Sequence, residues 1–172
     1  LMGVIEARKR NWEYLRRGLD GLGEFFDFAL PTHASAWLAP SGEDRSVKTE
    51  GEQSLSSHVS SFDWDGTQCR TDCSWFGFKI TLKETAPFSK TELVRYLDEH
   101  KIGNRMLFGG NLVRQPAFVR LRAERPDAFR VIGDLPVADR IMNRTFFLGT
   151  YPGLTEEMMD YEIDVITRFC SK

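Results

Sequence analysis

The 172-residue chain lacks several features that would assign it to a large class of proteins. It has only three cysteines, Cys69, Cys73 and Cys170, and an odd number without a secretory signal favours reduced thiols over disulfides. No apolar run approaches the roughly 20 residues that span a bilayer, and no charged start precedes an apolar core and a cleavage site. We therefore expect a cytoplasmic protein without a membrane partner.

A strong charge of either sign is also missing. The net charge is −2, so nucleic-acid binding has no electrostatic support beyond the run Arg8-Lys9-Arg10, which we interpret as the solvent side of a helix. Hydrophobic residues make up 41% of the chain and charged residues 28%, as in a globular domain with a core.

A set of residues for self-contained catalysis is absent as well. The three histidines belong to no motif, and there is no phosphate-binding loop. Two metal signals are weak. Cys69 and Cys73 have C-x3-C spacing without nearby histidine pairs. In the polar tract before residue 72 the spacing of the donors fits no known metal-binding loop, and a solvated tract is the simpler interpretation; these donors are His58, Asp63, Asp65 and Cys69. We predict no catalytic residue and no metal ligand.

What the chain does contain is centred on residues 75–118. Residues from Trp75 to Leu82 alternate with the period of a strand that has one buried face. The predicted core face carries Phe76, Phe78, Ile80 and Leu82, and the other face carries Trp75, Gly77, Lys79 and Thr81.

A capped helix follows this strand. Ser89 and Glu92 have the spacing of a capping box, and Phe88 and Leu93 have that of a hydrophobic staple. The helix is predicted to run to His100-Lys101, with Gly103 as the left-handed residue at its end.

A polar loop comes next, after a second short strand over 106–108. Gly109-Gly110 frees the backbone, and Asn111, Arg114 and Gln115 precede Pro116. Such a loop at the end of a strand is suited to a polar ligand, although an ordinary solvated loop has the same composition.

Three segments carry a resemblance to a known family. The segments SWFGFKITL, GNRMLFGGNLVRQPAF and DRIMNRTFFLGTYPGLTEEMMDY resemble the C-terminal part of CDP-6-deoxyhexulose 3-dehydratases. These enzymes of lipopolysaccharide biosynthesis belong to the DegT/DnrJ/StrS sugar-aminotransferase family of pyridoxal-phosphate enzymes. The similarity covers Ile5 to about Phe28 and Ser74 to Phe169, and the GGN-x-x-RQPAF block is specific to the dehydratase branch.

The resemblance implies that the chain is the C-terminal small domain of a fold-type I enzyme. Its large N-terminal domain would precede this chain, form a homodimer and hold pyridoxal or pyridoxamine phosphate (PLP or PMP). In these dehydratases a histidine replaces the Schiff-base lysine, the C3 hydroxyl of a CDP-4-keto-6-deoxy sugar leaves, and a [2Fe–2S] centre with a partner reductase supplies electrons. Because no residue here matches that histidine or the cluster cysteines, we expect the chain alone to be inactive.

The resemblance also suggests which residues bind the nucleotide-sugar substrate. By matched motif these are Asn111, Arg114 and Gln115, with Arg140 as a phosphate or sugar contact. The planar guanidinium fork suits a diphosphate because it donates two parallel hydrogen bonds. For Arg140, a surface ion pair with a neighbouring carboxylate is the alternative.

The rest of the chain supplies the remaining elements. The first helix, through Ile5, Trp12 and Leu19, has no N-cap, which suggests a fragment of a longer protein. Residues 40–72 have no sustained periodicity and are expected to be a mobile insertion. The other predicted elements are an edge strand over 25–30, a helix over 117–124, a strand over 129–132, a helix opened by Asp134 and Pro136 with Val137, Ile141 and Met142 inward, a strand over 145–148, a type II turn at Tyr151-Pro152-Gly153, and a last helix capped by Thr155 with Met159, Ile163, Ile166 and Cys170 buried.

This order predicts a single α+β domain over 1–172, with a small antiparallel or mixed sheet and helices packed on one face. Three other functions stay open: a sugar aminotransferase of the same family, a non-catalytic binding or regulatory module, and a structural cap for dimerisation.

Overall fold

The computed structural model describes residues 1–39 and 61–172. Five α-helices, three short 3-10 helices and six strands make up this part of the chain. In order they are α1 (Met2–Gly18), η1 (Asp20–Leu22), β1 (Phe26–Phe28), β2 (Ala34–Leu38), β3 (Ser61–Trp64), β4 (Gly77–Leu82), α2 (Lys90–Glu99), β5 (Asn104–Met106), η2 (Leu112–Arg114), α3 (Pro116–Glu124), η3 (Pro126–Ala128), α4 (Pro136–Arg144), β6 (Thr145–Gly149) and α5 (Glu156–Cys170).

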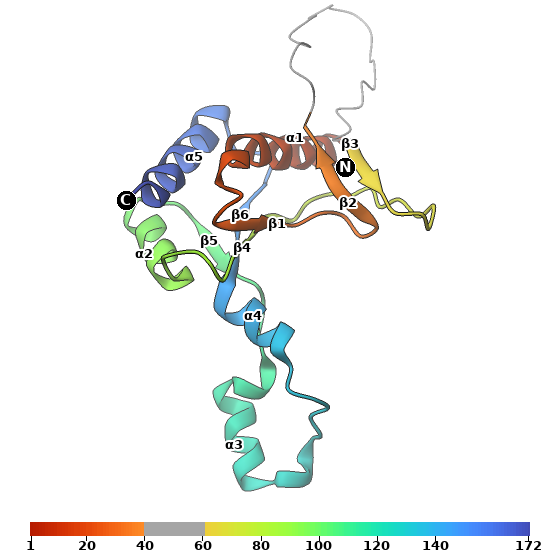
Figure 1. Ribbon diagram of the computed structural model, residues 1–172, viewed down its shortest axis with the longest axis vertical. Helices are drawn as coiled ribbons and strands as arrows, with labels where there is room; N and C mark the ends of the chain where they lie inside the picture. The colour runs from red at the N-terminus through yellow and green to blue at the C-terminus, as the bar shows by residue number, and fades with distance from the viewer. Residues whose placement is uncertain (40–60) are drawn as a thin grey trace, which may run out of the picture.

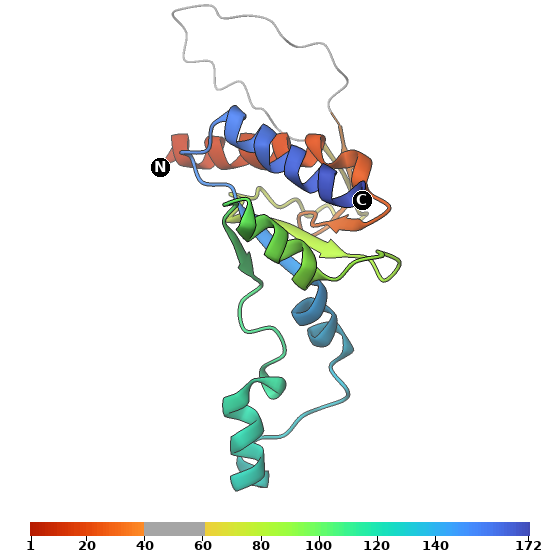
Figure 2. The ribbon, with the colours of Figure 1, turned by 90° about the vertical axis from the view of Figure 1, so that its left-hand side faces the viewer.

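The central sheet is antiparallel, with strand order β1-β4-β6-β5. Helices α1, α2 and α5 lie together on one side of it, and α4 continues directly into β6 (Figures 1 and 2). The predicted α+β class, with a small antiparallel sheet, is confirmed. Within the described residues no helix is long and apolar enough to cross a bilayer.

The core lies between this sheet and the three helices. Phe78, Ile80 and Leu82 of β4 are buried on the covered face, beside Phe146 and Leu148 of β6. The helices contribute Trp12, Leu15 and Leu19 from α1, Leu93 and Leu97 from α2, and Met159, Val165 and Ile166 from α5. Because β4 alternates, Lys79 and Thr81 point to the opposite face.

The predicted alternation is wrong at the start of this strand. Phe76 is 68% exposed and lies at a bend before Gly77, where its ring contacts Phe147 at a centroid distance of 5.8 Å. Trp75 instead stacks on Trp12 in the core, with centroids 4.4 Å apart. The bend therefore places Trp75 on the core side and Phe76 on the outer side, the reverse of the prediction. The alternation of side chains between two faces holds only within a regular strand.

Both ends of α2 are capped, but only the first as predicted. The Ser89–Glu92 capping box is present. At the other end Lys101, not Gly103, is the left-handed residue, with φ of 62°. Its N–H donates to the Asp98 carbonyl at 3.0 Å, and Ile102 N–H donates to the Leu97 carbonyl at 2.9 Å, which is a Schellman motif. The buried Ile102 side chain fixes this register.

A β-hairpin that the sequence analysis did not predict lies beside α1. Strands β2 and β3 pair antiparallel, and Trp37 and Phe62 contact Trp12 at centroid distances of 6.5 and 5.8 Å. Residues 40–60 of the expected insertion lie outside the described residues, whereas β3 begins the described part at 61.

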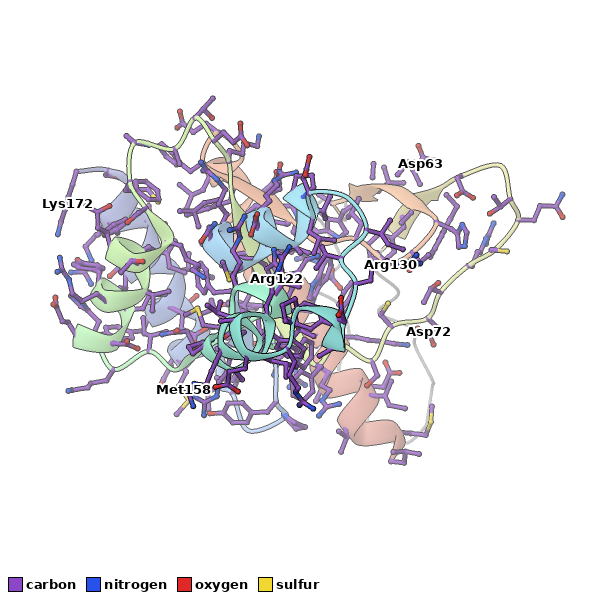
Figure 3. The ribbon with its side chains drawn as sticks, turned by 90° about the horizontal axis from the view of Figure 1, so that it is seen from below. Asp63, Asp72, Arg122, Arg130, Met158 and Lys172 are labelled. Atoms are coloured by element: carbon purple, nitrogen blue, oxygen red, sulfur yellow. The ribbon has the colours of Figure 1, made fainter. Side chains whose placement is uncertain are left out.

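Between β5 and α4 the chain forms an arm that projects from the body in both views (Figures 1 and 2). Figure 3 looks along this arm and shows Arg122 and Arg130 on it. Helix α3 has no buried residue, and Phe118 contacts Phe129 at 5.5 Å. The predicted strand over 129–132 is absent, because this segment pairs with no other strand among the described residues.

Three other local predictions are corrected. Strand β5 covers 104–106, since Phe108 has φ of 47° and turns the chain away. Helix α4 begins after Leu135, in a left-handed conformation, and Val137 is 69% exposed instead of inward. Gly153 has no positive φ, so the hydrogen-bonded turn that Tyr151 begins is not type II.

Candidate functional site

The loop between β5 and α3 lies against α4. Gly110 has φ of +58°, and a Cβ atom there would be 2.7 Å from Met142 Cγ and 3.3 Å from Met142 Cα. Both the backbone conformation and the close approach require glycine. The Gly-Gly pair therefore brings the predicted polar residues onto α4.

Asn111 is buried at this junction, with 2% of its surface exposed. Its Nδ2 donates to Asp139 Oδ1 at 2.8 Å, and its Oδ1 accepts from Val113 N–H at 3.2 Å. The side chain thus caps η2 and ties the loop to α4. In this conformation Asn111 holds the loop in place and is shielded from a ligand.

Arg114 forms a bidentate pair with the same carboxylate. Its Nε lies 2.5 Å from Asp139 Oδ1, and its Nη2 lies 2.6 Å from Oδ2. The Arg114 hydrogen bonds, and then the Asn111 bond, hold the pKa of Asp139 below its usual value, and Asp139 raises the pKa of Arg114. The Arg114 side chain is 58% exposed, and the pair uses two of its five N–H donors, so the others are available to a ligand.

Gln115 completes the group. Its Nε2 donates to the Gly109 carbonyl at 2.8 Å, which closes the loop on itself. Its amide oxygen has no hydrogen bond in the described part of the chain, so it can accept one from a ligand hydroxyl.

Arg140 does not join these three residues. Its Nη2 donates to Asp27 Oδ2 at 3.0 Å, on the β1 edge of the sheet. This is the ion pair that the sequence analysis gave as the alternative. Arg140 lines a separate hollow of about 240 Å³ between α4 and the sheet.

The residue that the sequence analysis missed is Asp139, which connects Asn111 and Arg114. It is 28 and 25 residues away from them along the chain, so no spacing rule relates the three. Its only signal in the sequence was a position on the polar side of a short helix.

A hollow of about 520 Å³ lies between α1 and α5, away from the arm that carries these residues (Figures 1 and 2). Its polar side chains already bind one another: Tyr14 donates to Asp160 at 2.7 Å, and Arg17 donates to Glu13 at 2.6 Å. We therefore place the candidate site at the loop and α4, where donors and acceptors remain available.

Two histidines and a lysine that could contact a pyridoxal cofactor already bind other groups of the described chain. His33 Nδ1 lies 3.0 Å from Asp65 Oδ2, and His100 Nδ1 lies 2.7 Å from the Tyr96 carbonyl. Lys90 donates to the Met142 carbonyl at 2.5 Å, and burial lowers its pKa.

An iron–sulfur cluster is not matched either. It requires four cysteine thiolates in its usual form, and the chain has three cysteines. Across residues 1–39 and 61–172, no group of three or more His, Cys, Asp or Glu side chains is arranged to hold a metal ion. His58, the remaining donor considered from the sequence, lies outside the described residues.

Sequence comparison identifies relatives over nearly the whole chain. Residues 53–167 match the DegT/DnrJ/EryC1/StrS aminotransferase family. The chain is 39% identical over 165 residues to the lipopolysaccharide biosynthesis protein RfbH of Salmonella typhimurium, covering 96% of this chain and 28% of that protein. It is 34% identical over 167 residues to a dTDP-4-dehydro-2,6-dideoxy-D-glucose 3-dehydratase of Saccharopolyspora spinosa, covering 96% of this chain and 27% of that protein.

Solved structures agree on the fold. A GDP-4-keto-6-deoxymannose-3-dehydratase variant with bound GDP-perosamine superposes with a TM-score of 0.63 at 17% identity, over 96% of this chain and 32% of that one. The E. coli GDP-4-keto-6-deoxy-D-mannose-3-dehydratase with bound hydrated PLP superposes with a TM-score of 0.60 at 17% identity, over 94% of this chain and 30% of that one. The chain spans about a third or less of the length of each of these four proteins. By its sequence match over two thirds of its length, the chain belongs to the DegT/DnrJ/EryC1/StrS aminotransferase family.

Proposed function

We propose that this chain is the C-terminal small domain of a nucleotide-sugar C3 dehydratase of deoxysugar biosynthesis, acting on a CDP-4-keto-6-deoxyhexose for lipopolysaccharide O-antigen. The observation that carries the proposal is the 39% and 34% identity, over 96% of the chain, to RfbH and to a 3-dehydratase. The large domain, the homodimer and a reductase partner belong to the same proposal, since the chain spans only 28% of the first relative.

Within this proposal the loop binds the hexose. Arg114 donates from the N–H groups that its pair with Asp139 does not use, and the amide oxygen of Gln115, which has no hydrogen bond in the described part of the chain, accepts from a sugar hydroxyl. Asn111 acts as a positioning residue because both its amide atoms already bind the chain. The loop is held by Asp139 before the ligand arrives, so little ordering cost remains at binding.

The cofactor in this proposal is PLP or PMP, supported by the PLP-bound structural relative. When bound, it supplies the electron sink of the reaction, and its contacts come from polypeptide beyond this chain. A [2Fe–2S] centre would likewise need ligands from elsewhere, because this chain has too few thiols. The chain's own residues bind and orient the sugar.

The test is made on the full-length gene product. Its absorption spectrum is recorded for bound PLP or PMP. CDP-4-keto-6-deoxyhexose is then added together with an electron-donating reductase, and in a separate reaction with an amino donor such as glutamate, with mass detection of the sugar. Loss of the C3 hydroxyl supports the proposal. A protein without cofactor or turnover contradicts it and favours a binding module.

Arg114→Ala tests the loop in the same assay. Removing a charge-assisted contact lowers kcat/KM by roughly 10- to 100-fold. The control is Arg120→Ala, an exposed arginine of α3 for which the structure gives no ion pair. Equal activity of the two variants would show that Arg114 does not contribute to substrate binding.

A second candidate is a sugar aminotransferase, favoured by the family to which residues 53–167 match. The two functions differ in the product. An aminotransferase replaces the keto oxygen with an amino group and keeps the C3 hydroxyl, so the same mass measurement separates them.

A further inference from the structure

The face of the sheet opposite the core carries a second set of polar groups. The register places Asp27 opposite Thr81, Thr81 opposite Thr145, and Lys79 opposite Phe147. Helices α1, α2 and α5 lie on the other side (Figure 2), and α4 covers only one end of this face. A hollow of about 240 Å³ remains between α4 and the strands, lined by Lys79, Thr81, Arg140, Asp27, Thr145 and Val137, among others.

Positive charge exceeds negative charge in this hollow. Asp27 is its only acidic side chain, and two cations already share it: Arg140 Nη2 at 3.0 Å and Lys83 Nζ at 3.9 Å. Lys79 is half-buried, and no carboxylate in the described part of the chain forms an ion pair with it. Lys79 therefore presents to the hollow an ammonium group that no described carboxylate neutralises, and such a group attracts an anionic ligand.

A hydroxyl donor lies beside these cations. Thr81 Oγ1 and Thr145 Oγ1 are 3.0 Å apart, and both residues line the hollow. Two hydroxyls have two hydrogens, and their mutual bond uses one, so one O–H remains to donate. The hollow therefore combines two cationic groups with one neutral donor and has several times the volume of about 30 Å³ that one water occupies.

We propose that Lys79 and Arg140, with the Thr81–Thr145 hydroxyl pair, bind the diphosphate group of a nucleotide ligand in the hollow between α4 and the open face of the sheet. A diphosphate has the charge and the multiple acceptor oxygens that this set of donors requires. The guanidinium of Arg140 can bind Asp27 and an oxyanion together, because it has five N–H donors.

The hollow adjoins the loop described above. Asp139 faces Arg114 and Asn111, whereas the next residue of α4, Arg140, faces the sheet. Successive helix residues point about 100° apart, so one short helix serves both groups. Resting on the proposed function, this places the diphosphate of a nucleotide sugar at Lys79 and Arg140 and its hexose near Arg114 and Gln115.

The test is a titration of the full-length gene product with CDP, inorganic pyrophosphate and inorganic phosphate, without turnover, by calorimetry. Lys79→Ala and Lys79→Gln weaken CDP and pyrophosphate binding roughly tenfold or more, and Lys79→Arg retains most of it. The matched control is Arg95→Ala, which removes one positive charge from α2 on the other side of the sheet. Arg95→Ala leaves binding unchanged, and added salt weakens binding in all proteins.

The proposal is overturned by wild-type affinity in both Lys79→Ala and Lys79→Gln, by equal losses in Lys79→Ala and Arg95→Ala, or by CDP binding that pyrophosphate does not compete with. Phosphate binding as tightly as pyrophosphate would assign the hollow to a single phosphate group and would also overturn it. The titration measures binding and the assay under the proposed function measures turnover, so the two proposals can fail separately. If the full-length protein dehydrates the sugar but its CDP binding does not depend on Lys79, only this inference is rejected. If binding depends on Lys79 but the sugar is not dehydrated, only the proposed function is rejected.

Discussion

At the scale of single residues, Asp139 connects the loop to α4 by accepting hydrogen bonds from Asn111 and Arg114. The pKa of Asp139 is lowered in the folded protein, so its contribution to stability is present above its unperturbed value of 3.8. That contribution is lost as the pH falls through the lowered folded value. The loop should therefore stay attached through the neutral range.

Asp139→Asn should loosen this loop at neutral pH. The neutral amide cannot pair with the Arg114 fork, so exchange of the Val113 and Arg114 amide hydrogens should become several-fold faster. Hydrogen exchange followed by mass spectrometry measures this. Asp134→Asn, at an exposed position just before α4, is the control. Unchanged exchange in Asp139→Asn would show that the backbone alone holds the loop.

Gly110→Ala should destabilise the protein by about 1–2 kcal/mol, the cost of a left-handed conformation for a residue with a Cβ. Contact of that Cβ with Met142 adds to the cost. Gly66→Ala, with no atom within 4 Å and an ordinary φ, should be close to neutral. Urea unfolding measures the stability of both variants. Equal unfolding midpoints for Gly110→Ala and Gly66→Ala would contradict the close packing of the loop on α4.

At the scale of elements, α2 shows how a helix end is chosen by packing. Its start follows from the Ser89–Glu92 pair, which is local. Its end depends on Ile102, which must be buried and therefore requires Lys101 to turn the chain. A lysine accepts the left-handed conformation because the buried isoleucine compensates for its cost.

Substitutions at this end of α2 should distinguish the two caps. Lys101→Gly relieves a positive φ and should stabilise the protein by up to about 1 kcal/mol. Gly103→Ala, at ordinary φ with no atom within 4 Å, should cost nothing. Chemical denaturation measures the stability of both variants. A loss of stability in Gly103→Ala would indicate that Gly103, not Lys101, caps the helix.

At the scale of the whole molecule, α5 buries a carboxyl group in the main packing layer. Glu162 is 8% exposed, its Oε2 has no hydrogen-bond partner among the described residues, and burial raises its pKa to about 7. Since the folded pKa lies above the usual 4.5, its stabilising effect is complete below that value. The effect disappears as the pH rises through about 7.

Glu162→Gln should remove this pH dependence. Between about pH 4 and pH 8, the wild type should lose on the order of 3 kcal/mol of unfolding free energy relative to the variant. Unfolding curves at several pH values measure the difference. Glu157→Gln, an exposed glutamate of the same helix, is the control and should follow the wild type. Parallel curves for wild type and Glu162→Gln would contradict a buried, unpaired carboxyl group.

Short-range sequence patterns were enough to predict several of the local structures. The α+β class, the strand through Ile80, the Ser89 and Thr155 caps and the Gly-Gly loop all follow from patterns within a few residues. Hydrophobic period, capping hydrogen bonds and glycine conformation act over such short distances, so neighbouring residues are enough to predict them.

Which distant groups meet depends on the three-dimensional packing and could not be predicted from short-range patterns. It stacks Trp75 on Trp12, joins Asp139 to Arg114, turns Arg140 toward Asp27 and leaves Lys79 facing a hollow. These contacts depend on how strands and helices pack, and packing is set by the summed burial of the whole core. The residues next to Trp75, Asp139, Arg140 and Lys79 in the sequence do not predict what these side chains contact. The interaction energies of these side chains depend on the charge and burial around them in three dimensions.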